Sequence, residues 1–407
     1  MSKRKVPIPK IFTSGQYRPQ EETLEVQYKP NKLFIGIPKE SSFQENRVAL
    51  TPSSVLSLVN HGHRVVVETN AGEKASFTDN DYSEAGADIA YSKAQVFKSD
   101  IIIKVAPPTL DEVDLLAPNQ MVISPIHLPT ITAEYVMKIR EKRVIALAME
   151  YIQDNNGSFP IVRTLSEIAG TSAMLTAAEL LTNVSEGRGI LLGGVSGVPP
   201  AKVVILGAGV VAEYAVRTAL GLGAQVRVFD NNVYKLMRLQ SSVGQRIYTS
   251  SIIQHVLEEE IDTADVAIGA IHSVEGRSPI VVSEEMVMNM RHGAVIIDVS
   301  IDQGGCFATS RVTTHEKPTF IKHGVIHYCV PNIASRVSRT ASSAVSNILT
   351  PILLEAETTG GLERLIYNNS GLRHGVYSFK GSLTNRHLGE RFGIKHTDLD
   401  LLMMSGL

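Results

Sequence analysis

Five polar residues are candidates for chemistry, because each follows a short apolar run of the kind that forms a buried strand. In parallel α/β sheets, ligands collect at the carboxyl ends of the strands. Two facing sheets would therefore bring such residues into one cleft. Taken singly, each also suits a structural role, such as a surface cation or a turn residue, so only their joint placement indicates a site. The five are Arg47, Lys104, His127, Asp302 and Asn332.

Their side chains suit the handling of a small carboxylic acid. The planar guanidinium of Arg47 can bind a carboxylate, and Lys104 adds a second positive charge. His127 can give and take a proton near neutral pH. Asp302 can orient or deprotonate water and bind ammonium, and Asn332 can position a substrate or a cofactor ring. The two cations and the asparagine are therefore predicted to bind substrate, and the other two residues to be catalytic.

A glycine-rich turn predicts a dinucleotide site. The apolar run 203–206 leads directly into G-x-G-x-x-A, formed by Gly207, Gly209 and Ala212, and a helical pattern follows at once. In such a turn the first glycine permits the tight bend and the second lets the backbone approach a pyrophosphate. The small third residue allows the helix to pack closely on the strand. The N-terminus of the helix offers its N–H groups to the phosphates.

Asp230 completes this pattern, 23 positions after Gly207 and at the end of the next apolar run. A carboxylate there can accept hydrogen bonds from the ribose hydroxyls of the cofactor and would repel a 2′-phosphate. No arginine follows it directly, although Lys235 is near and is a further cofactor-binding candidate. We therefore expect the cofactor to be NAD rather than NADP.

The elements that must position these residues come in two series of short apolar strands separated by helical stretches. Such a pattern indicates parallel sheets covered on both faces. Only the second series carries the glycine turn, which favours a substrate domain followed by a cofactor domain. Predicted strands are 33–37, 64–68, 101–104, 121–124 and 144–148, then 201–206, 225–229, 266–270, 294–299 and 325–330; predicted helices are 52–61, 133–141, 165–184, 212–220 and 341–357.

The expected fold class is α/β, with two doubly wound parallel-sheet domains, the second a Rossmann NAD-binding domain inserted in the first. The return of the chain to the first domain rests on analogy with two-domain dehydrogenases. Residues 1–32 are rich in Pro, Lys, Gln and Glu and show no period, which is typical of an extended arm or a disordered tail. The predicted divisions are an arm at 1–32, a substrate domain at 33–160, the NAD-binding domain at 161–338 and a C-terminal return at 339–407.

Composition excludes several classes of protein. The 407 residues are 43% hydrophobic and 20% charged, enough for two cores. The net charge of -2 gives no sign of a nucleic-acid partner. Two cysteines, Cys306 and Cys329, exclude a disulfide framework, and no His or Cys spacing suggests a metal. No apolar stretch is long enough for a membrane span or a secretory signal, so we expect a cytoplasmic protein with no membrane partner.

From Leu33 to near its C-terminus the chain resembles the alanine dehydrogenase family, over about nine-tenths of its length. That family shares its fold with the dinucleotide-binding subunit of proton-translocating transhydrogenase. The most specific matches surround the glycine turn and the D-Q-G-G turn that starts at Asp302. The matching passages are IGIPKE, ENRVALTP, IIIKV, the IHL around His127, SEIAG, GGVSGVPPAKVVILGAGVVAEYA and DVSIDQGGCFATSRVTTHEKPTF.

The resemblance implies reversible oxidative deamination of L-alanine to pyruvate and ammonia with NAD, carried out by a cytoplasmic homo-oligomer that is a hexamer. It carries substrate binding onto Arg47 and Lys104. It carries the acid/base role onto His127 and Asp302. Ser166, which lies in SEIAG, falls on a nucleotide-binding position, as do Asp230 and the glycines of the turn.

Several passages depart from the family's pattern. After Lys104 the chain reads V-A-P-P where V-K-E-P is common, and after Asn332 it reads I-A-S-R-V-S in place of M-P-G-A-V-P. S-P-I precedes His127 where bulky apolar residues are usual. His272 and Ser273 stand where apolar residues normally flank the nucleotide. These changes concern the substrate pocket and the loop over the nicotinamide.

Other functions therefore stay open. The altered pocket is compatible with a dehydrogenase of another small 2-amino acid, or with a weakly catalytic, nucleotide-binding regulatory paralogue. A transhydrogenase-like subunit is a third alternative, but His127 and the complete D-Q-G-G turn count against it.

Overall fold

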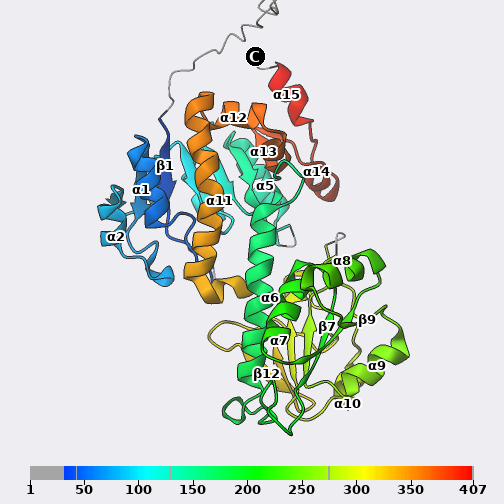
Figure 1. The fold of residues 1–407 in the computed structure, drawn as a ribbon. Helices are drawn as coiled ribbons and strands as arrows, with labels where there is room; N and C mark the ends of the chain where they lie inside the picture. Colours follow the sequence, from blue (N-terminus) through cyan, green and yellow to red (C-terminus); the bar gives the residue numbers. More distant parts are fainter. Residues whose placement is uncertain (1–31, 43, 129, 274–275, 406–407) are drawn as a thin grey trace, which may run out of the picture.

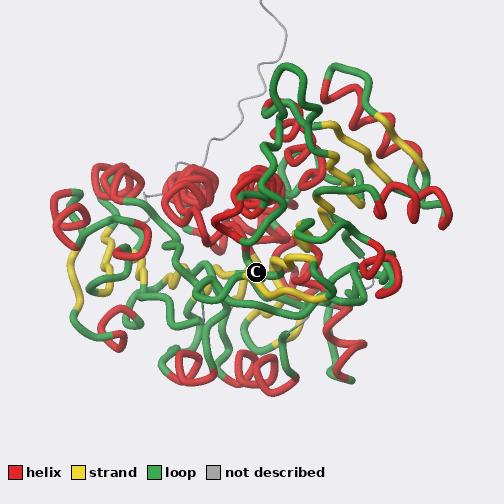
Figure 2. Tube along the Cα trace, turned by 90° about the horizontal axis from the view of Figure 1, so that it is seen from below, coloured by secondary structure: helices red, strands yellow, loops and turns green. Residues whose placement is uncertain are grey.

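The computed structural model describes residues 32–42, 44–128, 130–273 and 276–405, which form two β-sheets with helices packed around each (Figure 1). Figure 2 shows strands lying between layers of helices. The predicted arm at 1–32 lies outside the described residues except for Lys32. In the part of the chain that is described, no helix is long and apolar enough to cross a membrane.

The first sheet has eight strands in the order β15-β14-β6-β5-β4-β1-β2-β3. Its inner strands are apolar on both faces. Ile101 and Ile103 pack into one core and Ile102 into another, as expected for a sheet covered on both sides. The strands are β1 (Phe34–Ile37), β2 (Arg64–Glu68), β3 (Asp88–Ala90), β4 (Ile101–Ile103), β5 (Met121–Ser124), β6 (Ile145–Ala148), β14 (Val376–Phe379) and β15 (Ser382–Leu383).

The helices of this part of the chain cover both faces of the first sheet. Two of them begin with a reciprocal capping box, at Thr78 and at Thr109, where a threonine and an acid satisfy each other's backbone N–H groups. The second box holds Glu112, an acid that enters the candidate site. The helices are α1 (Pro52–Asn60), α2 (Asp79–Glu84), α3 (Lys93–Val96), α4 (Leu110–Asp114), α5 (Ala133–Glu141), α12 (Leu362–Asn368), α13 (Ser370–Gly375), α14 (Arg386–Phe392) and α15 (Leu399–Ser405).

The second sheet has seven strands in the order β12-β13-β11-β10-β7-β8-β9 and is inserted in the chain between β6 and β14. The strand order reverses between β7 and β10, a switch point of the kind at which such sheets bind ligands. The strands are β7 (Lys202–Leu206), β8 (Gln225–Phe229), β9 (Tyr248–Ser250), β10 (Val266–Gly269), β11 (Val295–Asp298), β12 (Thr319–Lys322) and β13 (Val325–Tyr328); the helices are α7 (Val210–Gly221), α8 (Val233–Val243), α9 (Gln254–Asp262) and α10 (Glu284–Asn289).

Two long helices lie where the chain passes between the parts that form the two sheets, and they pack against each other (Figure 1). They are α6 (Pro160–Leu180), between β6 and β7, and α11 (Ser338–Thr359), between β13 and β14. The sequence placed the first of these at 165–184, but it begins earlier because Pro160 suits the first turn of a helix. It ends earlier because the chain turns after Leu181, with Glu186 in a left-handed conformation. The predicted boundaries at 160 and 338 fall beside the starts of these two helices and stay predictions.

The predicted α/β fold with two parallel-dominated sheets is confirmed, and strand pairs at the edges of both sheets are antiparallel. β12 runs antiparallel to β13, and β14 runs antiparallel to both β6 and β15. Two-residue turns make two of these pairs, His323-Gly324 and Lys380-Gly381, and all four residues have positive φ. Such turns match the twist of a β-hairpin. β12, β14 and β15 were missed from the sequence because they lack a continuous apolar run, whereas β13 was predicted at 325–330.

Gly170 explains how α6 packs so closely on α7. A Cβ at this position would lie 2.2 Å from the carbonyl oxygen of Val211 and 2.9 Å from the backbone nitrogen of Ala215. The two helices therefore meet backbone to backbone, and the glycine of the S-E-I-A-G passage is required by packing.

We predict that Gly170→Ala lowers the free energy of unfolding by about 1–3 kcal/mol, the usual cost of overpacking, because the helices must separate. Gly221→Ala at the end of α7 is the control, since a Cβ there meets nothing within 4 Å. Thermal unfolding followed by circular dichroism measures both variants. Equal melting temperatures for the two would contradict the close packing of α6 on α7.

Candidate functional site

Arg47 lies in the loop between β1 and α1 and is only 5% exposed. Glu45 occupies the forked edge of its guanidinium: Nε donates to Oε1 at 2.7 Å and Nη2 to Oε2 at 2.7 Å. Burial alone would lower the pKa of Arg47, but Glu45 outweighs it and raises the pKa. The sequence predicted an arginine fork open to a substrate. The structure instead shows that this edge is already filled.

Lys104 follows β4 and is completely buried between two carboxylates. Its Nζ lies 2.7 Å from Oε2 of Glu40 and 3.4 Å from Oε2 of Glu112. Burial would lower the pKa of Lys104, yet the two carboxylates hold it above its usual value. The ammonium is thus kept charged, and the cost of burying it is offset by pairing.

Glu112 is itself held from three sides. It receives hydrogen bonds from Lys93 and from the hydroxyl of Ser41, at 2.5 and 2.7 Å, and closes the capping box of α4 with Thr109. Burial would raise the pKa of Glu112, but Lys104 and these donors lower it. The acids around both cations were missed from the sequence; only the T-x-x-E pattern at 109–112 signalled that one of them had a fixed position.

Asn332 joins the two domains at this point. It follows β13 with a left-handed backbone, φ 55°. Its Nδ2 donates to Oε2 of Glu45 at 2.8 Å, and its backbone nitrogen donates to Oδ1 of Asp302 at 3.0 Å. Arg47, Glu45, Asn332 and Asp302 therefore form one connected chain that crosses between the domains. Three residues that the sequence singled out are brought together in it.

His127 stands on a constrained turn after β5, with φ 49°. Its backbone N–H and that of Ile126 both donate to Oε1 of Glu150, at 3.2 and 2.7 Å. The other oxygen of Glu150 is buried and has no hydrogen-bond partner among the described residues. Burial raises the pKa of Glu150. This acid, which the sequence did not single out, fixes the backbone that presents His127.

The two predicted catalytic residues feel the charge of Arg47. His127 and Asp302 both reach solvent, although protein atoms crowd them closely. That crowding and the positive charge of Arg47 lower the pKa of His127. Removal from water raises the pKa of Asp302, and the hydrogen bond from Asn332 together with Arg47 opposes the rise. Both residues therefore interact with the charge of the same guanidinium.

The glycine turn has the geometry that a dinucleotide requires. Gly207 has φ +107°, and a Cβ there would lie 2.4 Å from the carbonyl oxygen of Ala270. Gly209 is the N-cap of α7 and gives the helix no side-chain cap. A Cβ on Gly209 would meet nothing within 4 Å, so open space lies in front of the free N–H groups. Ala212 is fully buried where α7 packs on the sheet. These residues fit a pyrophosphate.

Asp230 ends β8 beside this turn. Its Oδ2 accepts from the backbone N–H of Ala208 at 2.8 Å and its Oδ1 from that of Asn232 at 2.7 Å, so the carboxylate has a fixed orientation. Lys235 is exposed on α8 nearby. Arg238, which the sequence argument did not consider, donates to the carbonyl oxygen of Ala208 at 3.3 Å and adds a cation at the turn.

The other residues that the sequence singled out lie on α6 and in the part of the chain that forms the second sheet. Ser166 is half-buried on α6, the helix that packs against α7. Lys235 and burial both lower the pKa of His272, with burial the larger cause. Both cysteines are buried and free. Among the described residues no group of three or more His, Cys, Asp or Glu side chains is arranged to hold a metal ion.

The second domain carries a dinucleotide-type turn and the first a buried cluster of cations and carboxylates, and together they define a two-domain dinucleotide-binding α/β protein. Comparison with known families narrows the class. Residues 36–169 match the family model "Alanine dehydrogenase/PNT, N-terminal domain", and residues 173–386 match "Alanine dehydrogenase/PNT, C-terminal domain". The chain belongs to the alanine dehydrogenase/PNT family.

Individual relatives support the same family assignment. Alanine dehydrogenase 2 of Staphylococcus aureus is 39% identical over 369 residues, which cover 90% of this chain and 99% of that protein. A solved structure titled L-alanine dehydrogenase superposes with a TM-score of 0.82 at 38% identity and covers 88% of this chain and 99% of its own. A transhydrogenase from Sinorhizobium meliloti has a TM-score of 0.74 at 24% identity, with coverage of 87% and 99%, and shares the fold.

Glu150 yields a prediction whose sign depends on pH. Burial raises its folded-state pKa above the usual value of 4.5. The raised pKa means that the fold accommodates Glu150 more easily when the carboxyl is protonated. The stability that depends on this protonation is present in full below the unfolded-state pKa and is lost as the pH rises through the folded-state pKa. Glu150→Gln imitates the protonated form and keeps an oxygen for Ile126 and His127. We expect it to be as stable as the wild type, or more stable, at pH 7.

The advantage of the glutamine over the wild type should shrink as the pH falls through the folded-state pKa of Glu150 and should vanish below the usual value of 4.5, because the wild-type carboxyl is then protonated in both states. Glu150→Ala is the matched variant. It leaves two buried N–H groups without an acceptor and should cost about 1–3 kcal/mol. Urea unfolding at several pH values measures all three proteins. A glutamine variant that is as unstable as the alanine variant at pH 7 would refute this role of Glu150.

Proposed function

We propose that this protein catalyses the reversible, NAD-dependent oxidative deamination of L-alanine to pyruvate and ammonia. The observation that supports the proposal is the hydrogen-bonded chain from Arg47 through Glu45 and Asn332 to Asp302, which links a cation of the first domain to an acid of the domain that holds the dinucleotide turn. Family membership and relatives titled alanine dehydrogenase support the choice of substrate.

Substrate binding falls to Arg47 and Lys104. The substrate carboxylate would meet the edge of the Arg47 guanidinium that Glu45 leaves open. Lys104, kept charged by its two acids, lies at the same end of the sheet. Glu45 and Asn332 keep the guanidinium from rotating. The guanidinium is therefore already oriented when the substrate binds, and binding loses less conformational entropy, as in other preorganised sites.

Proton transfer falls to His127 and Asp302. The turn around Gly209 would hold NAD, which would supply the hydride acceptor needed to convert the substrate amine to an imine. Because the pKa of His127 is lowered, its imidazole is neutral near pH 7 and can take a proton from the attacking water. Asp302 accepts a hydrogen bond from Asn332 and can orient that water. The carbinolamine then collapses to pyruvate and ammonia as His127 returns its proton to the nitrogen.

The proposed domains correspond to substrate binding and cofactor binding. We propose that residues 33–160 and 339–407 form the substrate domain and that residues 161–338 form the NAD-binding domain, with Ser166, Asp230 and Lys235 among its cofactor-binding residues. We also propose a cytoplasmic homo-oligomer, a hexamer as in the family that the chain resembles. A nucleotide-binding regulatory paralogue is the second candidate, favoured by the filled edge of Arg47.

The activity prediction is direct. Purified protein should oxidise NADH, followed at 340 nm, when pyruvate and ammonium are supplied together. His127→Ala and Asp302→Asn should each lower kcat/KM by about 100-fold to 10,000-fold, the range for loss of a general acid or base. His61→Ala, an exposed histidine at the end of α1, is the control and should leave the rate unchanged.

Other outcomes choose between the candidates. Turnover that requires a different 2-keto acid would replace alanine with another 2-amino acid. Binding of NADH without turnover of any tested 2-keto acid would reject the enzymatic proposal in favour of the regulatory one.

Cofactor choice is tested at Asp230. Asp230→Ala should weaken NAD binding by about tenfold, equivalent to about 1.4 kcal/mol, and reduce the preference for NAD over NADP. Asp230→Asn keeps an oxygen for the Ala208 N–H but removes the charge, so it separates repulsion of a 2′-phosphate from support of the turn. Fluorescence titration with NADH and NADPH measures both. An unchanged ratio of the two affinities in both variants would show that the carboxylate does not select the cofactor.

A further inference from the structure

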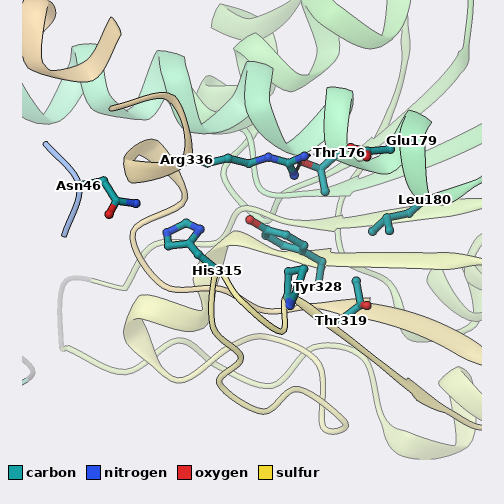
Figure 3. Close-up of a pocket in the computed structure, with 9 residues that line it drawn as sticks. Asn46, Thr176, Glu179, Leu180, His315, Thr319, Tyr328 and Arg336 are labelled. Carbon is teal, nitrogen blue, oxygen red and sulfur yellow. Dashed lines mark hydrogen bonds and ion pairs between the residues drawn. The ribbon is translucent and has the colours of Figure 1, made fainter. Parts of the chain in front are cut away.

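A second, larger cavity lies where α6, β13 and the segment η6 (Ile333–Val337) meet, with a volume of about 300 Å³ (Figure 3). It shares only Asn46 with the small cavity of about 10 Å³ that Arg47 lines. Its size is at the low end for small-molecule sites. Its lining is Asn46, Thr176, Glu179, Leu180, His315, Pro318, Thr319, Tyr328 and Arg336.

Arg336 brings a positive charge to this cavity. Its guanidinium donates to the hydroxyl of Thr176 at 2.6 Å and to Oε2 of Glu179 at 2.9 Å. The Glu179 side chain is 63% exposed. A pair with so exposed an acid is weak, so it holds the arginine in place without removing its capacity to bind an anion. Arg336 stands in the I-A-S-R-V-S passage that departs from the family's pattern.

Two buried polar atoms beside Arg336 have no hydrogen-bond partner among the described residues. They are the hydroxyl of Tyr328, a residue only 2% exposed, and Nε2 of His315. In Figure 3 the Tyr328 hydroxyl points into the space between the His315 ring and the Arg336 side chain. Buried polar atoms are almost always paired, so this convergence indicates a missing occupant. Burial raises the pKa of Tyr328 more than the neighbouring Arg336 guanidinium lowers it, so the hydroxyl keeps a proton to donate.

The walls of the cavity come from both domains. Asn46 belongs to the first domain, and its backbone N–H donates to Oγ of Ser335 at 2.9 Å. The backbone N–H of His315, in the second domain, donates to Oε1 of Gln44 at 2.8 Å. An occupant would therefore contact the two domains where they already touch. Asn46 is adjacent to Arg47 in the sequence, but Arg47 itself does not line this cavity.

We propose that this cavity is a binding site for a small oxyanion, a carboxylate or inorganic phosphate, distinct from the substrate and nucleotide sites. Arg336 supplies the charge, Tyr328 donates a hydrogen bond, and His315 donates a second one when Nε2 carries a proton. The inference does not depend on the proposed dehydrogenase activity, because it concerns binding alone.

Isothermal titration calorimetry of the full chain with inorganic phosphate tests the site, at low ionic strength and with NAD present to fill the helix end at Gly209. A parallel titration with acetate distinguishes a phosphate site from a carboxylate site. We expect one saturable site per chain. Tyr328→Phe should weaken binding about fivefold and Arg336→Gln at least about tenfold, as for loss of a neutral and of a charged hydrogen bond.

Arg373→Gln is the matched control, because Arg373 also pairs with an exposed acid, Asp400, but lies far from the cavity on α13; its binding should equal the wild type. Three results overturn the proposal. One is the absence of saturable binding of either anion. Another is equal binding by the wild type, Tyr328→Phe and Arg336→Gln. The third is dissociation of an oligomer by both variants in light scattering, which would make the cavity a contact between copies.

Discussion

The candidate site depends on the carboxylate of Glu45. This buried group accepts from the guanidinium of Arg47 and from the side-chain amide of Asn332, and so links a loop of one domain to a loop of the other. Burial would raise the pKa of Glu45, but Arg47 lowers it, and the carboxylate is therefore charged when it makes these contacts. Because a buried charge with one partner removed is costly, the arrangement is fixed as a unit.

The same principle governs the wider cluster in the first domain. Three cations, Arg47, Lys104 and Lys93, face three acids, Glu40, Glu45 and Glu112, through direct ion pairs. The cluster is nearly neutral before any ligand enters. Selection of a substrate by this site therefore rests on the geometry of individual donors more than on a long-range attraction for anions. Pairing within this cluster also explains how Arg47 and Lys104 can be buried near the carboxyl ends of apolar strands.

Much of this architecture could be predicted from the sequence, for identifiable physical reasons. Continuous β-branched runs can be buried only in a sheet covered on both faces, so most inner strands were located to within a residue or two. Chemistry at strand ends was predictable from the same argument. The five polar candidates do lie at the ends of parallel strands, and Asn332 does contact Asp302. The glycine turn could be predicted because its small residues have identifiable roles: Gly207 has positive φ and lies against Ala270, and Ala212 is buried where α7 packs on the sheet.

What the sequence could not supply were pairings across distance. Nothing in the sequence near Lys104 indicates that Glu40 pairs with it. No sequence pattern indicates that the Glu45 carboxylate binds the guanidinium of Arg47. Glu150 is 23 residues from the turn it supports. Edge strands were missed because they are short and because hairpin turns such as His323-Gly324 are brief signals. The unpartnered atoms of Tyr328 and His315 can be recognised only once their surroundings are known.

A double-mutant cycle between Glu45→Gln and Asn332→Ala tests the central claim most directly, with the free energy of unfolding and kcat/KM measured for the wild type, both single variants and the double variant. If the Glu45 carboxylate links the domains through Asn332, the two substitutions should be non-additive by about 0.5–3 kcal/mol, as for residues in direct contact. Additive effects in both measurements would contradict the account.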